Sequence, residues 1–455
     1  MFVEIARTLD EATPALDFEI PLPAGDERYV DFSAVRGSGS VARLRTLLKR
    51  QPPDRRLHAV FASHRGAGKS TELLHLMNDV RDQYYSIYFE ANVELDAVEF
   101  SMEELLLVIA RVVEERMRER DTPIRPELLK KVEDWFAEVV FTDEEGRSYL
   151  AGVHTEAKAE GGIPFFAKLL ASLTAGFKVE SHHKKSVKNT LQQFPGTLLT
   201  HVNNLLNDAS GKLEQEGKRL LIIIDNMDRY APAVIDRLLV ESPDRFKQLR
   251  AHLIVTPLMT LLVRPESQSI RSVFKCETMP TVKLREPHES YGALTAEGSE
   301  LLRNVLGQRI DLARLIPDEA AQNRLIATSG GAVRELLEMA QDASLDATGE
   351  AITMADIELA LNRRRSLMRD MIDNNGWWDV LAEIAQLKKL DHDPAFLTVV
   401  FHRLAFQYNG TVWYDVHPLV AELLSDRGLL KKSSKEKVAK KKAAAKRVSR
   451  KAKSE

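Results

Sequence analysis

The sequence predicts an α/β fold with a three-layer core built around a mostly parallel sheet. Short apolar runs, each about the length of a strand, alternate with amphipathic helical segments through the first 290 residues. The clearest run is Leu220–Ile224, and its unbroken apolar side chains are typical of a strand buried on both faces. After residue 290 the strand signals fade and helical patterns dominate, which predicts a separate helical region.

Changes in pattern and composition divide the chain into regions. We expect a lead-in and helix over 1–50, a core over 51–290 with an insertion over about 120–200, a helical lid over 291–350, a small winged-helix-like domain over 351–430 and a basic disordered tail over 431–455. The winged-helix prediction depends on helices followed by Asn409-Gly410, a strong hairpin signal between two apolar and aromatic runs.

One helical face in the insertion is apolar. It either packs on the core or meets a partner or a membrane surface, and these alternatives stay open. The residues of this face are Phe166, Leu169, Leu170, Leu173 and Phe177.

Charge is unevenly distributed along the chain. The segment 431–455 holds 12 Lys and Arg residues and 2 Glu residues, whereas the rest holds 52 basic and 65 acidic residues. A basic tail on an acidic body is typical of contact with nucleic acid or another acidic partner, and a solvated tail is the alternative. The single cysteine, Cys276, excludes an intramolecular disulfide. Because the sequence has neither a signal-type segment nor an apolar run that spans a bilayer, we expect a cytoplasmic protein.

A glycine-rich segment joins the first predicted strand to the next helix. It reads Ser63-His-Arg-Gly-Ala-Gly-Lys-Ser-Thr71 and nearly matches the P-loop pattern, with Ser63 in place of the first glycine. Backbone N–H groups at such a turn surround phosphate oxygens, Lys69 meets the β- and γ-phosphates, and Ser70 binds Mg²⁺. The predicted phosphate-binding residues are Arg65, Gly66, Ala67, Gly68, Lys69, Ser70 and Thr71.

A second motif supports a nucleotide site. Asp225 ends the predicted strand that begins at Leu220, where the Mg²⁺-binding carboxylate of a P-loop NTPase belongs. The two motifs in this order predict that the chain binds ATP with Mg²⁺. The next residue is Asn226 rather than a glutamate, so the role of catalytic base falls to Asp228 or to another carboxylate such as Glu90.

Four further residues are candidates for contact with the terminal phosphate. Thr256 ends the next predicted strand, and Arg334 lies near the start of a later helix. Arg264 and Arg271 follow Thr256, and we expect one of them to act on the nucleotide of a neighbouring subunit. For each of the four, an ordinary structural or surface role is the alternative.

The order of these features resembles the AAA-type ATPases, nearest the origin-recognition and STAND-like branches, over residues 28–430. The segments Arg28-Tyr-Val-Asp31 and Arg36-Gly37 resemble the part of that family that lies against the adenine. The resemblance implies an α/β core with a helical lid, oligomerisation or switching that depends on ATP, and action on another macromolecule. Asn226 and the long insertion depart from the family pattern.

The leading hypothesis is a Mg²⁺-dependent ATPase that acts as a switch or assembly factor. We expect a homo-oligomer and a protein partner, and analogy suggests a role in antiviral defence. One alternative is a nucleic-acid-binding loader that is regulated by ATP and anchored by the tail 431–455. Another is a nucleotide-binding scaffold that does not hydrolyse ATP. In the winged-helix-like domain, the presumed recognition helix, Pro394 to Leu404, has only His402 and Arg403 as basic residues. Because phosphate contacts need Lys or Arg, this favours protein contacts for the domain.

Overall fold

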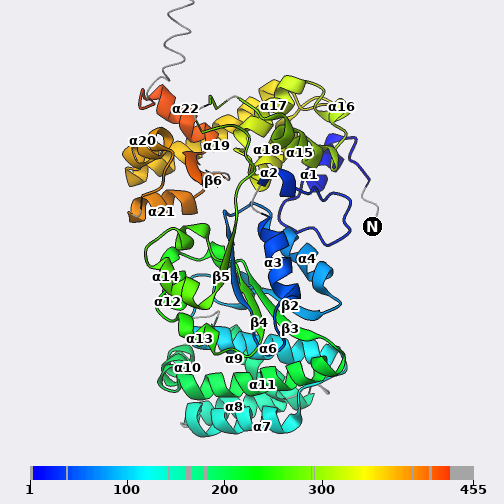
Figure 1. Cartoon of the computed structure of the whole chain (residues 1–455), viewed down its shortest axis with the longest axis vertical. Coiled ribbons are helices and arrows are strands. Elements are labelled where there is room, and N and C mark those ends of the chain that lie inside the picture. The colour runs from blue at the N-terminus through cyan, green and yellow to red at the C-terminus, as the bar shows by residue number, and fades with distance from the viewer. Residues whose placement is uncertain are drawn as a thin grey trace, which may run out of the picture. The chain divides into compact units, whose positions relative to one another are not determined.

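The structure is a computed structural model that describes residues 4–36, 39–141, 144–159, 165–177, 182–287, 289–291, 293–391, 393–408 and 412–430. The chain divides into two compact units (Figure 1). Unit 1 is formed by Glu19–Tyr29 and Arg36–Pro280. Unit 2 is formed by the described parts of Phe2–Phe18, Val30–Val35 and Thr281–Glu455.

A parallel five-stranded sheet forms the centre of unit 1, with the strand order β2-β3-β4-β1-β5. Its strands are β1 (His58–Ser63), β2 (Tyr84–Glu90), β3 (Arg219–Asp225), β4 (His252–Val255) and β5 (Lys275–Met279). Strand β4 lies between β1 and β3, although it follows both in the sequence. The register places Glu90 directly beside Asp225 at the carboxyl ends of β2 and β3.

Helices cover both faces of this sheet. Leu221 and Ile223 of β3 belong to the apolar cluster that includes residues of α3 and α4. Ile222 and Ile224, which alternate with them, belong to the cluster that includes α6 and α11. A strand buried on both faces requires an unbroken apolar run, so the predicted three-layer α/β core is confirmed. The covering helices are α3 (Ser40–Lys49), α4 (Lys69–Val80), α6 (Met102–Glu119) and α11 (Pro195–Gln215).

The insertion is helical and packs on the α6 side of the sheet. Phe166, Leu169 and Leu170 are fully buried and Leu173 is nearly so, all within the cluster that contains α6. This face therefore packs on the core rather than facing a partner or a membrane, and the side chain of Phe177 lies outside the described residues. The helices of the insertion are α7 (Pro126–Trp135), a π-helical turn (Phe136–Val140), α8 (Glu144–Ala159), α9 (Phe165–Phe177) and α10 (His182–Gln193).

The last strand of the sheet ends earlier than the sequence pattern indicates. The sequence Met279-Pro-Thr-Val-Lys-Leu284 predicts a strand by its apolar residues, and this prediction is wrong, because β5 ends at Met279. Pro280 has no N–H group and cannot extend the ladder. Val282 and Leu284 are instead buried in the core of unit 2.

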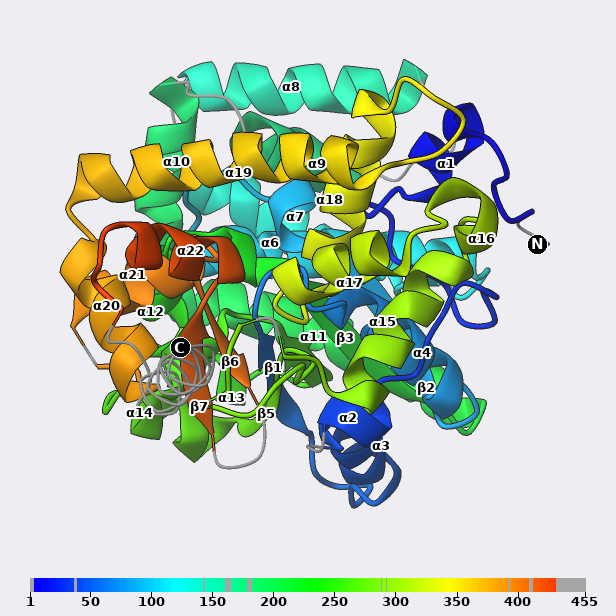
Figure 2. The ribbon, with the colours of Figure 1, turned by 90° about the horizontal axis from the view of Figure 1, so that it is seen from above.

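Unit 2 is mainly helical. The 22-residue helix α19 (Met354–Asn375) has α18 (Val333–Asp346) and α22 (Pro418–Asp426) packed against it (Figure 2). The antiparallel pair β6 (Ala405–Tyr408) and β7 (Trp413–Val416) confirms the predicted hairpin, whose Asn409-Gly410 tip lies outside the described residues. The other helices of this unit include α1 (Leu9–Ala15), α15 (Ala296–Gly307), α16 (Leu312–Leu315), α17 (Glu319–Thr328), α20 (Trp378–Leu387) and α21 (Pro394–Phe401).

Short helical segments complete the backbone. They are α2 (Ser33–Arg36), α5 (Ala91–Glu94), α12 (Pro232–Leu239), α13 (Pro243–Lys247) and α14 (Ser267–Val273), with 3-10 turns at Met227–Arg229 and Met259–Leu262. Among the described helices, none combines the length and the apolar character that crossing a bilayer requires.

Candidate nucleotide site

The glycine-rich segment forms a tight turn between β1 and α4. Gly66 and Gly68 have φ angles of 80° and 92°, a left-handed conformation that glycine adopts at little cost. Gly68 is the N-cap of the 12-residue helix α4 and provides no side-chain hydrogen bond to the first backbone N–H groups. These donors and the helix dipole favour an anion at this end of the helix.

Ser63, which occupies the position of the first glycine of the P-loop pattern, forms two side-chain hydrogen bonds. Its hydroxyl donates a 2.8 Å hydrogen bond to the carbonyl of His64 and accepts one of 3.1 Å from Nζ of Lys69. Burial, and then the charge of Lys69, lowers the pKa of His64 to about 3. The imidazole beside the lysine is therefore neutral at neutral pH.

Lys69 also contacts the acidic loop that follows β3. Its Nζ lies 2.7 Å from Oδ2 of Asp228, and both side chains are 5% exposed. Oδ1 of Asp228 is buried and has no hydrogen-bond partner within the described part of the chain. The structure thus brings together the predicted phosphate-binding lysine and the predicted base.

Asp225 is fully buried at the end of β3 and is held by three donors. Oδ1 accepts hydrogen bonds from the hydroxyl of Thr256 (2.7 Å) and the backbone N–H of Asn226 (2.8 Å). Oδ2 accepts one from the hydroxyl of Tyr88 (2.8 Å). Burial, followed by the charge of Asp225, raises the pKa of Tyr88, so its hydroxyl keeps the proton that it donates. A hydrogen bond with Ser70 acts in the opposite direction, which indicates that Ser70 lies close to the same hydroxyl.

The residue after Asp225 contacts the neighbouring strand. Asn226 has a φ of 60°, and its Nδ2 donates a 2.7 Å hydrogen bond to Oε2 of Glu90 at the end of β2. The other carboxylate oxygen of Glu90 lies 3.5 Å from the hydroxyl of Tyr88, whose proton is donated to Asp225. Glu90 therefore lies in a fixed orientation beside Asp225.

A P-loop follows β1, and a buried carboxylate ends β3, with β4 inserted between these strands. The core of unit 1 has the P-loop NTPase fold. No family model matches the chain, and no curated protein matches it in sequence.

Solved structures with a similar course of the chain are distant in sequence. The Walker-type ATPase of Pyrococcus abyssi is 12% identical, over 90% of this chain and 99% of that one, with a TM-score of 0.44. Cdc6p from Pyrobaculum aerophilum is 10% identical, over 91% of this chain and 97% of that one, with a TM-score of 0.39. The Aeropyrum pernix ORC1 protein, solved in complex with DNA, is 11% identical, over 91% of this chain and 96% of that one, with a TM-score of 0.40. The assignment of the P-loop fold depends on the sheet order and the turn geometry of this chain alone.

The segment before the P-loop core lies along α4. The guanidinium of Arg36, which is 5% exposed, donates to the carbonyl of Ala67 and lies 3.3 Å from Glu72. The ring of Tyr29 stacks on His75 with 3.9 Å between centroids. The sequence predicted that the segments containing Arg36 and Tyr29 lie near the adenine, but it did not predict these contacts.

The remaining predicted site residues have other surroundings. Thr71 accepts a 3.1 Å hydrogen bond from the backbone N–H of Leu22, and Arg65 is half-buried within the P-loop. Arg264 pairs with Asp236, and Arg271 donates to the carbonyl of Leu262 at 3.3 Å. Arg334 belongs to unit 2, where its guanidinium carbon lies 5.4 Å from the ring centroid of Phe18.

Sequence reasoning missed the role of Tyr88. Its hydroxyl contacts the carboxylates of Asp225 and Glu90, and a hydrogen bond with Ser70 affects its pKa. The available signal was that β2 ends in Tyr88-Phe-Glu90, with polar groups near the carboxyl end of a predicted strand. That signal becomes specific only when β2 is known to pair with β3.

Proposed function

We propose that the chain binds ATP together with Mg²⁺ at the P-loop and hydrolyses it. The observation that carries the proposal is the P-loop turn next to a fixed, fully buried carboxylate. Asp225 is held by three hydrogen bonds, and Tyr88 links it to Ser70 on the first turn of α4. Such preorganised groups act on charge without having to reorient.

Lys69 and the first N–H groups of α4 bind the phosphates in this proposal. The lysine is paired with Asp228 at 2.7 Å, and a bound phosphate replaces this carboxylate as its anionic partner. Arg65, Gly66, Ala67, Gly68 and Thr71 contribute backbone donors around the same phosphates.

Ser70 and Asp225 are the residues that would hold Mg²⁺. Hydroxyl and carboxylate oxygens are the ligands that this hard cation prefers. The fit is supported by Tyr88, whose hydroxyl interacts with both side chains. When bound, Mg²⁺ neutralises charge that develops on the phosphates.

Glu90 is our choice for the carboxylate that orients the attacking water. Asn226 orients the carboxylate by donating to Oε2, and Oε1, which lies 3.5 Å from the hydroxyl of Tyr88, is left to accept a proton from water. Asp228 is the alternative, but its carboxylate is paired with the ammonium of Lys69. Thr256 acts through Asp225, whose Oδ1 it contacts, and Arg334 remains a proposed contact to the terminal phosphate.

The free energy of hydrolysis would drive a conformational switch that acts on a macromolecular partner. We propose that the active form is a homo-oligomer that engages a protein. Arg271 is the better candidate for action on a neighbouring subunit, because Arg264 is held by two contacts to Asp236.

The test is phosphate release from ATP and Mg²⁺ by the wild type, Lys69→Ala and Asp225→Asn. We expect turnover in the wild type and a loss of about 10²-fold or more in both variants. Tight ATP binding without phosphate release from the wild type, with and without added DNA, would instead indicate a scaffold that does not hydrolyse ATP.

A second candidate function is a nucleic-acid loader. It is favoured by the 12 basic residues of the segment 431–455, which lies outside the described residues. The expected result is DNA binding that weakens steeply with salt and disappears when this segment is removed. DNA binding that persists after the truncation would contradict a role for the tail.

A further inference from the structure

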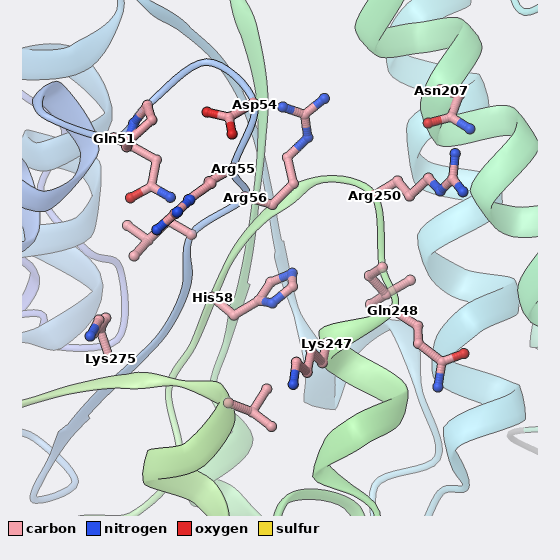
Figure 3. Close-up of a pocket in the computed structure, with 14 residues that line it drawn as sticks. Gln51, Asp54, Arg55, Arg56, His58, Asn207, Lys247, Gln248, Arg250 and Lys275 are labelled. Carbon is pink, nitrogen blue, oxygen red and sulfur yellow. The ribbon is translucent and has the colours of Figure 1, made fainter.

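A hollow lies at the end of the sheet where its strands begin, away from the P-loop. Figure 3 shows the residues that line it. It has a volume of about 720 Å³ and opens where β1 and β5 begin, at His58 and Lys275. The segment Lys247–Arg250, just before β4, forms another wall. Since β1 has six residues, the start of this strand is roughly 17 Å from the end that leads into the P-loop. The two sites are therefore distinct.

The wall of this hollow is strongly basic, although the body of the chain is acidic. One carboxylate, Asp54, also lines it. Figure 3 shows the cationic side chains around the imidazole of His58. The cationic residues are Arg55, Arg56, Lys247, Arg250 and Lys275.

Most of these cations have no carboxylate partner. Within the described ranges, the side chains of Arg55, Lys247, Arg250 and Lys275 form no ion pair and no hydrogen bond, and all four residues are exposed. Arg56 is the exception, since it lies 3.7 Å from Glu214. Like charges around one hollow repel each other, and a bound anion removes this repulsion.

His58 lies at the floor of the hollow. His58 is 7% exposed, and its Nε2 is buried with no hydrogen-bond partner in the described part of the chain. A buried polar atom without a partner costs free energy. Burial lowers the pKa of His58, and backbone hydrogen bonds with Leu249 and Ala251 act in the opposite direction, so the ring is neutral at neutral pH.

We propose that this hollow, which we call the basic pocket, binds a small molecule that carries several phosphate groups. Guanidinium and ammonium groups recognise phosphates by charge and by directed hydrogen bonds. The apolar lining residues are Pro52, Leu57, Leu249 and Val273, which offer no aromatic ring on which a base could stack. A pocket of this size accommodates a small ligand. The charge of the lining therefore indicates a cluster of phosphates as the recognised group.

The test uses inorganic tripolyphosphate and isothermal titration calorimetry. To remove the P-loop site without leaving a buried unpaired charge, the background is Lys69→Ala with Asp228→Asn. We expect this protein to bind one tripolyphosphate per chain. Adding Lys247→Ala and Arg250→Ala should weaken binding by about 10- to 100-fold, because two charged contacts are lost.

Lys130→Ala with Arg237→Ala is the matched control. It removes two exposed cations from the same unit, outside the basic pocket, and should leave binding unchanged. Lys275→Glu provides a second pocket variant and should also weaken binding, because it replaces a cation with an anion. Absence of binding in the background protein, or equal binding by the pocket variants, would overturn the proposal. So would binding of a single-stranded oligonucleotide that depends on the basic pocket when tripolyphosphate does not bind.

Discussion

The ammonium of Lys69 lies 2.7 Å from Oδ2 of Asp228, and neither side chain is more than 5% exposed. This buried ion pair connects the first turn of α4 to the loop after β3. The lysine is thus already neutralised by a carboxylate at the position where the proposed nucleotide would bind. Nucleotide binding then exchanges one anionic partner of Lys69 for another, and the exchange has measurable consequences.

Asp228→Asn should tighten ATP binding by about 3- to 10-fold. The lysine no longer has to leave a carboxylate, and a negative charge near the phosphates is removed. The same change should lower the stability of the nucleotide-free protein, because a buried ammonium loses its partner. Calorimetric titration and thermal unfolding with and without ATP measure the two effects. The exposed Asp134→Asn is the control, and weaker ATP binding by Asp228→Asn would mean that Asp228 helps to hold the ligand.

Glu90→Gln should lower kcat by about 10²- to 10⁴-fold while the Kd for ATP changes little. The amide retains the size of the side chain and can contact Asn226 and Tyr88, but it cannot accept a proton from water. Phosphate release in single-turnover assays measures the effect. Glu99→Gln, at a carboxylate that is 55% exposed, should behave as the wild type. If Glu90→Gln remains active and Asp228→Asn is inactive, Asp228 is the base.

Gly68→Ala should destabilise unit 1 by about 1–2 kcal/mol, because the residue at this position has a φ of 92°. The cause is backbone conformation rather than a clash, since an added Cβ would meet only Arg36, at 4.0 Å. ATP binding should also weaken as the turn distorts. Urea unfolding measures the first effect and titration the second.

Gly211→Ala is the matched control for this change. Gly211 lies inside helix α11, and an added Cβ there would meet nothing within 4 Å. This variant should therefore be stabilised by about 0.5–1 kcal/mol. Equal effects of the two substitutions would contradict a special role for the conformation at Gly68.

Unit 1 should lose stability as the pH falls from about 6.5 towards 3. Burial, and then the charges of Arg56 and Arg219, lowers the pKa of His252 to about 3. The unfolded chain therefore binds a proton at this residue below about pH 6.5, whereas the folded chain does not. The stabilisation by neutral His252 is complete above pH 6.5 and decreases through this window.

His252→Asn should remove this part of the pH dependence. The difference between the free energies of unfolding at pH 7 and pH 5 should decrease by about 2 kcal/mol. The Oδ1 of asparagine can replace Nδ1 as acceptor of the 3.1 Å hydrogen bond from the N–H of Leu57, but the ring contact with Tyr84 is lost, so the variant should be less stable at both pH values. Urea unfolding at the two pH values is the measurement, with the exposed His154→Asn as control. An unchanged pH dependence would show that His252 is not responsible.

Much of the fold could be predicted because its signals are local. The apolar run that ends at Asp225 has to be a strand buried on both faces, and it is. The β6–β7 hairpin follows from turn chemistry, whereas helical periodicity identified the apolar face of α9 but not that it packs on the core. The end of β5 was misjudged because apolar residues continue beyond Pro280 into a second core.

The sequence alone determined which residues form the P-loop, since Gly66, Gly68, Lys69 and Ser70 act through a few consecutive backbone units. It could not determine their partners. Tyr88 and Glu90 reach Asp225 only because β2 pairs with β3. Asp228 reaches Lys69 only because the strand order brings the ends of β1 and β3 near each other, on either side of β4. The basic pocket likewise forms only where the starts of β1, β4 and β5 meet. Parallel pairing joins segments far apart in the chain, and such contacts depend on the packing of the whole sheet rather than on any local pattern.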